Sequence, residues 1–270
     1  MLLLVFIVSF LMISSVSAGF LDIFPNADSS IGNDEHNLVV GFNSEFPPFG
    51  YNDNGNFTGF DLDLAQEVCK RNNWTFVPTP IIDWQSKEAE LNSGAIDCLW
   101  SEFTINGRED DYTWSDPYFN NSQVFVVKED SGIDSIDDLK GKTVEVQIAS
   151  SALDSLNEKN QSLKNSFGEL TQVKEYNTAF MDLESGACDA VLGDIGIMNY
   201  HLQEQFAGKG YKILDTPLSY EQYGIGFKKG NTELKNQVQK TLNEMFEDGT
   251  VDKIAQKYKD YDIPDGLVYP

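Results

Sequence analysis

The stretch ELNSGAIDC, residues 90–98, returns in altered form as DLESGACDA, residues 182–190. Both stretches contain the polar end of a helix, then a glycine at which a helix can stop, then small and apolar residues typical of a buried strand. A helix that stops at glycine and leads into a strand is also a common local arrangement. The segments that flank the two stretches therefore decide whether the chain contains the same fold twice.

The flanking segments repeat as well. In the first half, predicted strands and helices alternate in the order strand 38–42, helix 61–71, strand 74–77, helix 87–92 and strand 96–99. The second half gives the order strand 143–148, helix from about 151, strand 173–176, helix 179–184 and strand 188–192. This alternation predicts an α/β fold with two similar lobes.

Two extended, apolar segments, 123–128 and 223–228, connect the halves and are predicted to form a hinge. The C-terminal segment has apolar residues at helical spacing and is expected to pack on the first lobe. Ligands of doubly wound α/β domains lie at the carboxyl ends of strands, so we expect a ligand cleft between the lobes. The predicted lobes are residues 37–125 plus 223–270 and residues 126–222.

The N-terminal segment is apolar from residue 2 to residue 13 apart from one serine, and small residues follow up to Ala18. This pattern is typical of an export signal, predicted at residues 1–18 and followed by a polar linker over 19–36. We therefore expect an extracytoplasmic protein that is periplasmic, on the cell surface or secreted. No Lys or Arg precedes the apolar run, so an uncleaved N-terminal anchor is the alternative.

The composition argues against several classes of function. The chain has 19 basic and 43 acidic residues and a formal net charge of −24, a field that repels nucleic acid. The acids are scattered and lack the spacing of a calcium loop. The three cysteines, Cys69, Cys98 and Cys188, lie in apolar segments, and the two histidines have no close cysteine pair with which to hold zinc. We expect no nucleic-acid partner, no metal site and no cofactor.

A series of short motifs runs through the chain in a fixed order. The motifs are FPPF at 46–49, GFDLDLA at 59–65, SGAID at 93–97, TINGR at 104–108, WSDPY at 114–118, DLKGK at 138–142 and EDGT at 247–250. Over about residues 37–262, this series resembles the polar-amino-acid solute-binding proteins of ABC importers. The resemblance implies a periplasmic-binding-protein fold of type II, a monomer that closes on a small amino acid, and transient docking on the membrane permease.

A free amino acid carries a carboxylate and an ammonium group on one carbon, so a selective pocket needs a fixed cation and a fixed anion. By the resemblance, Arg108 lies where the family's arginine holds the carboxylate, for which a planar guanidinium can donate two parallel hydrogen bonds. A solvated arginine beside the acids at 109–111 is the alternative. Thr104 would add a hydroxyl donor. Relatives place five steps between these two positions and this chain has four, so we expect a different turn at Asn106–Gly107.

The resemblance also implies which groups receive the ammonium group. From the first lobe these are Ser101 and the backbone carbonyl of Glu102, and from the second lobe the carboxylate of Asp194. Ser150 and Ser151 open a predicted helix, whose free N–H groups favour an anion. For these two serines and for Asp194, an ordinary helix N-cap is the alternative.

Four further residues match positions around the ligand's side chain. Phe46 and Trp84 match aromatic positions that enclose this side chain in the family, with a core role as the alternative. Asn43 and Gln147 fall where relatives vary with the ligand. Relatives that take Arg, Lys or His often have an acidic residue at the first of these positions. Asn43 therefore favours a neutral polar ligand, although Glu102 could restore a negative charge nearby.

Two other functions stay open. Periplasmic cyclohexadienyl dehydratases resemble this family, and Glu102 is the candidate acid for such a reaction. A sensory module that acts through a separate receptor chain is the second alternative. The chain contains no serine-nucleophile elbow, phosphate loop or dinucleotide fingerprint. We expect a binding protein that is not an enzyme.

Overall fold

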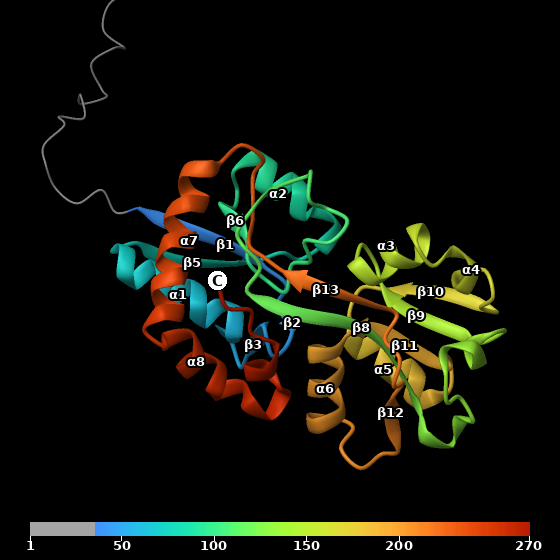
Figure 1. Ribbon diagram of the computed structural model, residues 1–270. Coiled ribbons are helices and arrows are strands. Elements are labelled where there is room, and N and C mark those ends of the chain that lie inside the picture. Colours follow the sequence, from blue (N-terminus) through green and yellow to red (C-terminus); the bar gives the residue numbers. More distant parts are fainter. Residues whose placement is uncertain (1–35) are drawn as a thin grey trace, which may run out of the picture. The chain divides into compact units, whose positions relative to one another are not determined.

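The computed structural model describes residues 36–270 and contains two separate main sheets (Figure 1). The strands of the first sheet are β1 (Asn37–Phe42), β5 (Thr75–Pro80), β6 (Cys98–Leu99), β7 (Thr113–Trp114) and β14 (Gly226–Phe227). Their order is β5-β1-β6-β14-β7, with β1 parallel to both of its neighbours. A small antiparallel sheet consists of β2 (Glu45–Phe46), β3 (Gly50–Asp53) and β4 (Asn56–Thr58).

Helices cover the first sheet. They are α1 (Phe60–Asn72), α2 (Lys87–Ser93), α7 (Thr232–Glu247) and α8 (Thr250–Ala255). Helix α1 starts with Asp61 and Asp63 in its first turn, where carboxylates complement the helix dipole, and ends at Asn73 in a left-handed conformation. It contacts β5, α7 and α8, so the C-terminal helices pack on the first lobe as predicted.

The second sheet contains six strands. They are β8 (Phe119–Lys128), β9 (Thr143–Gln147), β10 (Glu169–Val173), β11 (Ala190–Asp194), β12 (Tyr211–Ile213) and β13 (Ser219–Tyr223). The order is β10-β9-β11-β8-β12, and β13 also pairs with β8. The helices of this part are α3 (Ser151–Glu158), α4 (Gln161–Lys164), α5 (Tyr176–Ser185) and α6 (Ile195–Glu204). Short 3-10 turns complete the fold at Trp84–Ser86, Glu129–Ser131, Ile136–Leu139, Gln256–Tyr261 and Ile263–Gly266.

Strands β8 and β13 run side by side where the chain passes between the two sheets (Figure 1). They pair antiparallel over five residues, from Phe119 opposite Tyr223 to Gln123 opposite Ser219. The predicted hinge segment 123–128 lies within β8, and the predicted segment 223–228 begins at the end of β13 and includes β14. The hinge itself and the lobe boundaries stay predictions.

The two repeated stretches have the same local structure. Helix α2 ends at Gly94 and helix α5 at Gly186, both left-handed with φ of 81° and 82°. In each case the glycine N–H donates to the carbonyl three residues earlier, and the following N–H donates to the carbonyl five residues earlier. The aspartate that follows, Asp97 or Asp189, accepts at 2.8 Å from a backbone N–H of the neighbouring strand. The internal repeat read from the sequence is therefore a structural repeat.

One predicted strand was wrong. Segment 173–176 was expected to be extended, but β10 covers Glu169–Val173 and α5 starts at Tyr176. Tyr176 is buried together with Ala179, Phe180 and Leu183, a helical spacing that fixes its place on the inner face of α5. The first hydrophobic core cluster extends from the first sheet to α5 and α6. A second cluster occupies the other face of the second sheet.

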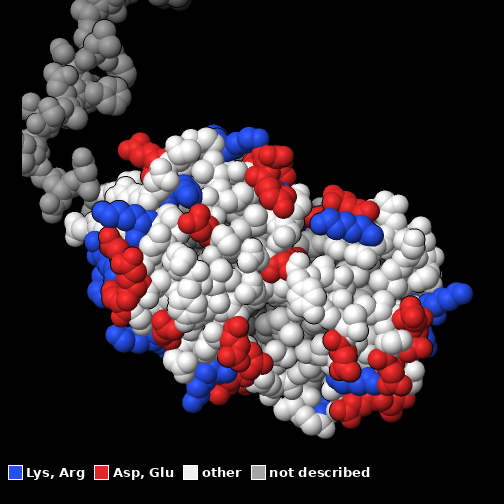
Figure 2. All heavy atoms as spheres, viewed as in Figure 1, with Lys and Arg blue, Asp and Glu red and all other residues white. Residues whose placement is uncertain are grey.

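Acidic and basic side chains intermingle on the surface shown in Figure 2, and no large patch of one sign dominates that face. Cys69, Cys98 and Cys188 are buried and unbridged. Among residues 36–270, no helix is both long and apolar enough to cross a membrane. The predicted signal at 1–18 and the linker at 19–36, apart from His36, lie outside the described residues.

Candidate functional site

The loop after β6 has a fixed and strained geometry. Glu102 is left-handed with φ of 42°, a conformation that non-glycine residues rarely adopt. Its backbone N–H donates to Asp61 Oδ2 at 2.6 Å, while Asp61 Oδ1 accepts from the Tyr118 hydroxyl at 2.8 Å. The Ser101 hydroxyl donates to the Glu102 carboxyl and accepts from the N–H of Asn43. These bonds hold Glu102 in place at the end of the strand.

Burial raises the pKa of two carboxyl groups at this loop, Asp61 of α1 and Glu102. Burial raises the pKa of Asp61 to about 7, although its two hydrogen bonds oppose the shift. Burial also raises the pKa of Glu102 well above its usual range, with smaller contributions in the same direction from the charges of Asp61 and Asp194. The first lobe therefore brings a buried carboxyl with a raised pKa to the end of β6.

Arg108 follows the turn that the sequence predicts. The Arg108 N–H donates to the Ile105 carbonyl at 2.9 Å across Asn106 and Gly107, and Gly107 has φ of 84°. The guanidinium lies 5.4 Å from the centre of the Phe103 ring, and its Nη2 is 2.7 Å from Asp154 Oδ2 on helix α3. Arg108 is thus not a solvated surface arginine, because it crosses from the loop of the first lobe to a helix of the second.

The start of helix α3 faces this loop. Ser150 is the N-cap, since its Oγ accepts from the Leu153 N–H at 3.2 Å and donates to the Gln147 carbonyl at 2.7 Å. Ser151 Oγ instead points across the cleft and lies 3.3 Å from Thr104 Oγ1. The helix-cap alternative therefore holds for the side chain of Ser150 and not for that of Ser151.

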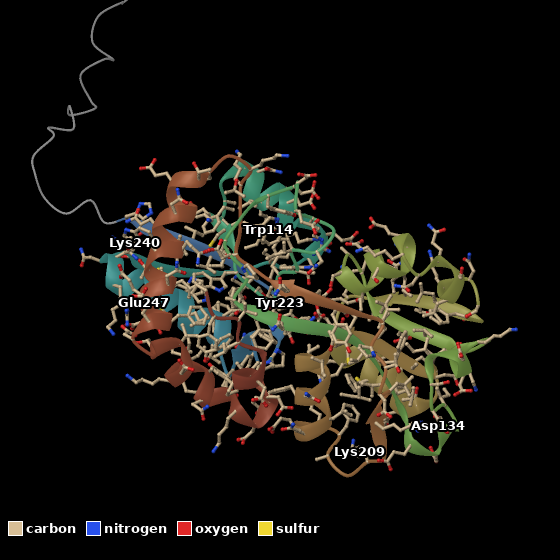
Figure 3. The ribbon with its side chains drawn as sticks, in the orientation of Figure 1. Trp114, Asp134, Lys209, Tyr223, Lys240 and Glu247 are labelled. Carbon is tan, nitrogen blue, oxygen red and sulfur yellow. The ribbon has the colours of Figure 1, made fainter. Side chains whose placement is uncertain are left out.

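Asp194 lies at the junction of β11 and α6, and its carboxyl does not cap the helix. Its Oδ1 accepts from Asn121 Nδ2 at 2.5 Å, from Gln123 Nε2 at 2.8 Å and from the Tyr223 hydroxyl at 2.7 Å. These three partners come from the paired strands β8 and β13, and Figure 3 shows Tyr223 in this central part of the molecule. Burial and the charge of Glu221 raise the pKa of Asp194 well above its usual range.

Glu221 is not among the site residues predicted from the sequence. This residue of β13 is 6% exposed, and its Oε1 accepts from Thr104 Oγ1 at 2.9 Å and from Ser151 Oγ at 3.2 Å. Asn121 and Gln123 also donate to it, each at 2.7 Å. The signal was present in the alternation of the strand, because Glu221 and Tyr223 are two residues apart and so share its buried face.

Ten side chains from both lobes line a small cavity between the sheets. They are Phe46, Trp84, Glu102, Phe103, Thr104, Arg108, Gln147, Ser150, Ser151 and Asp194. All but Phe103 were predicted as site residues from the sequence. The cavity volume is about 20 Å³, the space of about one water molecule.

The other two predicted residues lie next to this cavity. Asn43 lines an adjoining hollow together with Trp84 and Gln147. Ser101 is fully buried beneath Glu102 and contributes through its hydrogen bonds. Phe46 is 2% exposed and has its ring edge-on to Tyr176 at 5.7 Å. The predicted residues thus gather in one region, in which Asn43 and Ser101 lie just outside the cavity wall.

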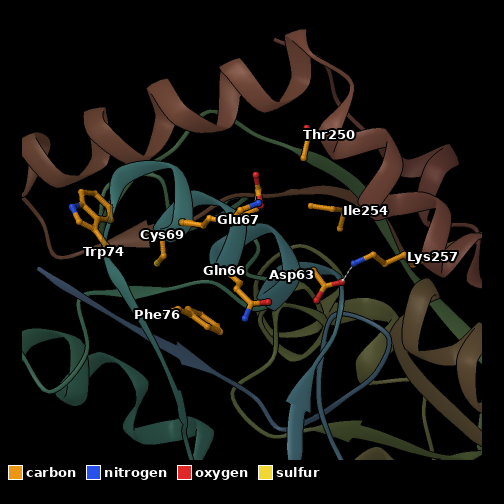
Figure 4. A pocket seen from close by; sticks show the side chains of 10 residues that line it. Asp63, Gln66, Glu67, Cys69, Trp74, Phe76, Thr250, Ile254 and Lys257 are labelled. Atoms are coloured by element: carbon orange, nitrogen blue, oxygen red, sulfur yellow. Dashed lines mark hydrogen bonds and ion pairs between the residues drawn. The ribbon is translucent and has the colours of Figure 1, made fainter. Parts of the chain in front are cut away.

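A larger hollow lies elsewhere, between α1, β5 and α8 (Figure 4). Its volume is about 750 Å³, and its wall includes Trp74, Phe76 and the ion pair of Lys257 with Asp63 at 2.9 Å. It contains none of the predicted site residues. Within the described residues, no cluster of His, Cys, Asp or Glu is arranged to hold a metal ion.

The comparisons with known proteins agree on one family. The family model of the bacterial extracellular solute-binding proteins, family 3, matches residues 38–261. A probable amino-acid-binding protein of Bacillus subtilis, YxeM, is 30% identical over 250 residues, which cover 88% of this chain and 89% of that protein. The histidine-binding periplasmic protein of Escherichia coli K12 is 29% identical over 253 residues, 90% of this chain and 95% of that one.

A solved structure resembles the described fold closely. It is an ABC uptake transporter substrate-binding protein from Streptococcus pneumoniae with bound histidine, superposed with a TM-score of 0.78 at 32% sequence identity. The match covers 82% of this chain and 91% of that one. The fold is therefore the two-lobed α/β arrangement that the sequence predicts.

Proposed function

Because the chain belongs to the bacterial extracellular solute-binding proteins of family 3, we propose that it is the substrate-binding component of an amino-acid ABC importer. The similar proteins are named for histidine binding or for probable amino-acid binding, and one is named as part of an ABC uptake transporter. The ligand is an L-amino acid held between the lobes.

The observation that carries this proposal is the opposition of charges across the cavity. Arg108 enters the cavity from the first lobe, and Asp194 enters from the end of a strand of the second. A molecule with a carboxylate and an ammonium group on one carbon can satisfy both at once. The guanidinium can shift from its present partner, the half-exposed Asp154, because such an exposed pairing is weak.

The hydroxyl of Thr104, predicted as a donor to the ligand carboxylate, is assigned a different role in this proposal. Thr104 and Ser151 donate to Glu221, so their hydrogens are not directed at a ligand carboxylate. The carboxylate is held instead by Arg108 and by the backbone N–H groups that open α3, where the helix dipole favours an anion. The ammonium group is held by Asp194, the Glu102 carbonyl and the oxygen of Thr104.

An amino acid needs more room than the cavity offers. Its volume of about 20 Å³ holds about one water molecule, so ligand entry requires the lobes to separate. Strands β8 and β13 connect the sheets and supply the hinge for this motion. Phe46 and Trp84 then enclose the side chain of the ligand, and Asn43 and Gln147 contact its end.

One observation favours a second function, an enzyme on the same scaffold. Glu102 lines the cavity and its pKa is raised by burial, as a general acid requires. The similar proteins are named as binding proteins, which makes binding without chemistry the better proposal. Formation of phenylpyruvate from prephenate, lost in Glu102→Gln, would establish the enzyme instead.

The remaining parts of the proposal concern the protein's partners. We place the protein outside the cytoplasm, as a monomer that docks transiently on a membrane permease. Size-exclusion chromatography with light scattering tests the monomer, and co-purification with a permease tests the docking.

The proposed function is tested by thermal unfolding in the presence of each proteinogenic L-amino acid and of L-cystine. A ligand at about 100 times its Kd stabilises the folded state by about 2.7 kcal/mol, which raises Tm by several degrees. Arg108→Ala should lose this shift. Arg71→Ala is the matched control, because Arg71 pairs with Glu67 and Asp248 away from the cleft and should keep the shift. No shift with any amino acid for the unaltered protein would refute the proposal.

A further inference from the structure

Asp194 and Glu221, here called the carboxyl pair, share their hydrogen-bond donors. The same Asn121 Nδ2 donates to Asp194 Oδ1 at 2.5 Å and to Glu221 Oε1 at 2.7 Å. Gln123 Nε2 likewise donates to both, at 2.8 Å and 2.7 Å. The two carboxyl oxygens therefore lie side by side, and both residues are more than nine-tenths buried.

Two ionised carboxylates that lie side by side in a buried site repel each other strongly, unless a proton or a cation lies between them. The pKa of Asp194 responds accordingly, since burial and Glu221 raise it well above its usual range. The amide groups of Asn121 and Gln123 lessen the repulsion without adding a positive charge. The buried, side-by-side arrangement of the two carboxyls therefore favours the binding of one proton by the pair.

The groups that face the carboxyl pair from the neighbouring elements do not provide a cation. Tyr223 on β13 and Tyr176 on α5 have pKa values raised well above 10 and stay neutral. Glu102, on the loop of the first lobe, adds a third acid. Arg108 lines the same cavity, but its guanidinium is bound to Asp154. Among residues 36–270, the positive charge that the pair requires is not supplied at this place.

This inference rests on the proposed binding of an amino acid. We propose that Glu221 joins Asp194 in receiving the ammonium group of the ligand and that the carboxyl pair exchanges one proton for this group. The ammonium group donates hydrogen bonds to the pair and neutralises one of its charges, and the displaced proton passes to solvent. Glu221 is then a specificity-determining residue, because the doubly ionised pair accepts a cationic group and rejects a neutral one.

Glu221 also orients the first lobe's part of the subsite. The Thr104 hydroxyl donates its hydrogen to Glu221 at 2.9 Å, so the lone pairs of Thr104 Oγ1 are left for a donor in the cavity. An ammonium group is such a donor. The carboxyl pair thus acts together with Thr104 of the first lobe. Closure of the lobes completes the subsite.

The exchange has a measurable consequence. When one proton leaves as each ligand binds, the association constant rises about tenfold per pH unit while the pair is protonated in the free protein. Isothermal titration calorimetry in buffers of different ionisation enthalpy counts the released protons directly. The probes are L-arginine and L-glutamine, since neither side chain titrates between about pH 5.5 and about pH 8.

For the unaltered protein we expect release of about one proton per bound probe and the full pH slope. Glu221→Gln replaces the second carboxyl by a neutral amide of the same size and removes its charge from the pair, so proton release should fall clearly below that of the unaltered protein and the affinity should depend less steeply on pH. Glu169→Gln is the control, because Glu169 is an exposed residue of β10, and this variant should keep the full slope. A merely structural role of Glu221 would change affinity without changing the number of protons.

The experiments distinguish a failure of the proton exchange from a failure of amino-acid binding. A probe that binds the unaltered protein without proton release, or a Glu221→Gln variant that releases as many protons as the unaltered protein, would overturn the exchange and leave amino-acid binding intact. Absence of binding for every amino acid in the thermal screen would overturn the proposed function and the exchange with it. The proton count of the unaltered protein decides the matter even where Glu221→Gln fails to fold.

Discussion

The segments around Gly94 and Gly186 have the same local structure, but the segments that follow them carry side chains of opposite charge to the cleft. Both end a helix with a left-handed glycine, and both continue to an aspartate that binds a neighbouring strand, Asp97 in one and Asp189 in the other. Beyond this point the first segment enters a loop that ends in a cation, whereas the second ends in a carboxylate at a helix start. The repeated part builds the scaffold, and the part that differs faces the cleft.

The two cleft-facing ends are held in different ways. Glu102 is held within the first lobe, where the buried carboxyl of Asp61 accepts its backbone N–H and Ser101 donates to its carboxyl. Asp194 is fixed by side chains of the connecting strands, among them Gln123 and Tyr223. A movement of the connecting strands therefore displaces Asp194 more directly than Glu102.

The largest expected effect comes from removing either of the two charged side chains that face the cleft. Arg108→Ala and Asp194→Asn should each weaken amino-acid binding by a factor of about 100 or more, since the first leaves the ligand carboxylate without a cation and the second removes one of the two carboxyls that receive the ammonium group. Calorimetric titration measures both affinities, with circular dichroism as the check on folding. A variant that retained its affinity would show that the ligand head group is not divided between the lobes.

The second effect concerns the pH dependence of stability and is specific to the first lobe. The Asp61 carboxyl has a pKa near 4 when unfolded and about 7 when folded, so its contribution to stability is full below about pH 4 and is lost as the pH rises through 7. Asp61→Asn should remove this loss. Between about pH 4 and about pH 8, the free energy of unfolding of the variant should therefore rise by up to about 4 kcal/mol relative to that of the unaltered protein.

Urea unfolding at a series of pH values measures this difference. Asp260→Asn, at an exposed position, is the control and should leave the pH profile unchanged. A profile for Asp61→Asn that runs parallel to that of the unaltered protein would contradict the assignment of the raised pKa.

A smaller effect tests the repeated scaffold. Asp97→Ala and Asp189→Ala each remove the acceptor of a strand N–H, that of Val39 or of Thr143, and should each cost about 1 to 3 kcal/mol. Because the two bonds have the same length and role, the two costs should agree closely. Chemical denaturation measures both, and a large difference would show that the repeat is similar in shape but not in energy.

The smallest effect is that of the helix-stop glycines. A Cβ at Gly94 or Gly186 meets no neighbouring atom, so Gly94→Ala and Gly186→Ala should cost only the left-handed backbone strain of about 1 kcal/mol each. Asn tolerates this conformation better, and Gly94→Asn should cost less than Gly94→Ala. Equal costs for Asn and Ala would indicate that the strain is not of backbone origin.

Much of the site could be read from the sequence, and some of it could not. Nine predicted residues line one cavity because motifs kept in a fixed order along the chain accompany a fixed fold. Glu221 escaped notice because the alternation of its strand marks it only as buried and does not mark it as a site residue. Its importance comes from Thr104, Asn121 and Gln123, which precede it by about a hundred residues and meet it only in the folded chain.

The sequence by itself determined the alternation of strands and helices, the internal repeat and the residue types at the ends of the strands, because these depend on local periodicity and on glycine stops. Only the tertiary structure decided which groups face each other across the cleft. In the folded chain the hydroxyls of Thr104 and Ser151 donate hydrogen bonds to Glu221, and Glu221 lies beside Asp194. The physical reason is that hydrogen bonds and charge repulsion depend on distances in space, which the pairing of β8 with β13 sets and which local sequence patterns do not encode.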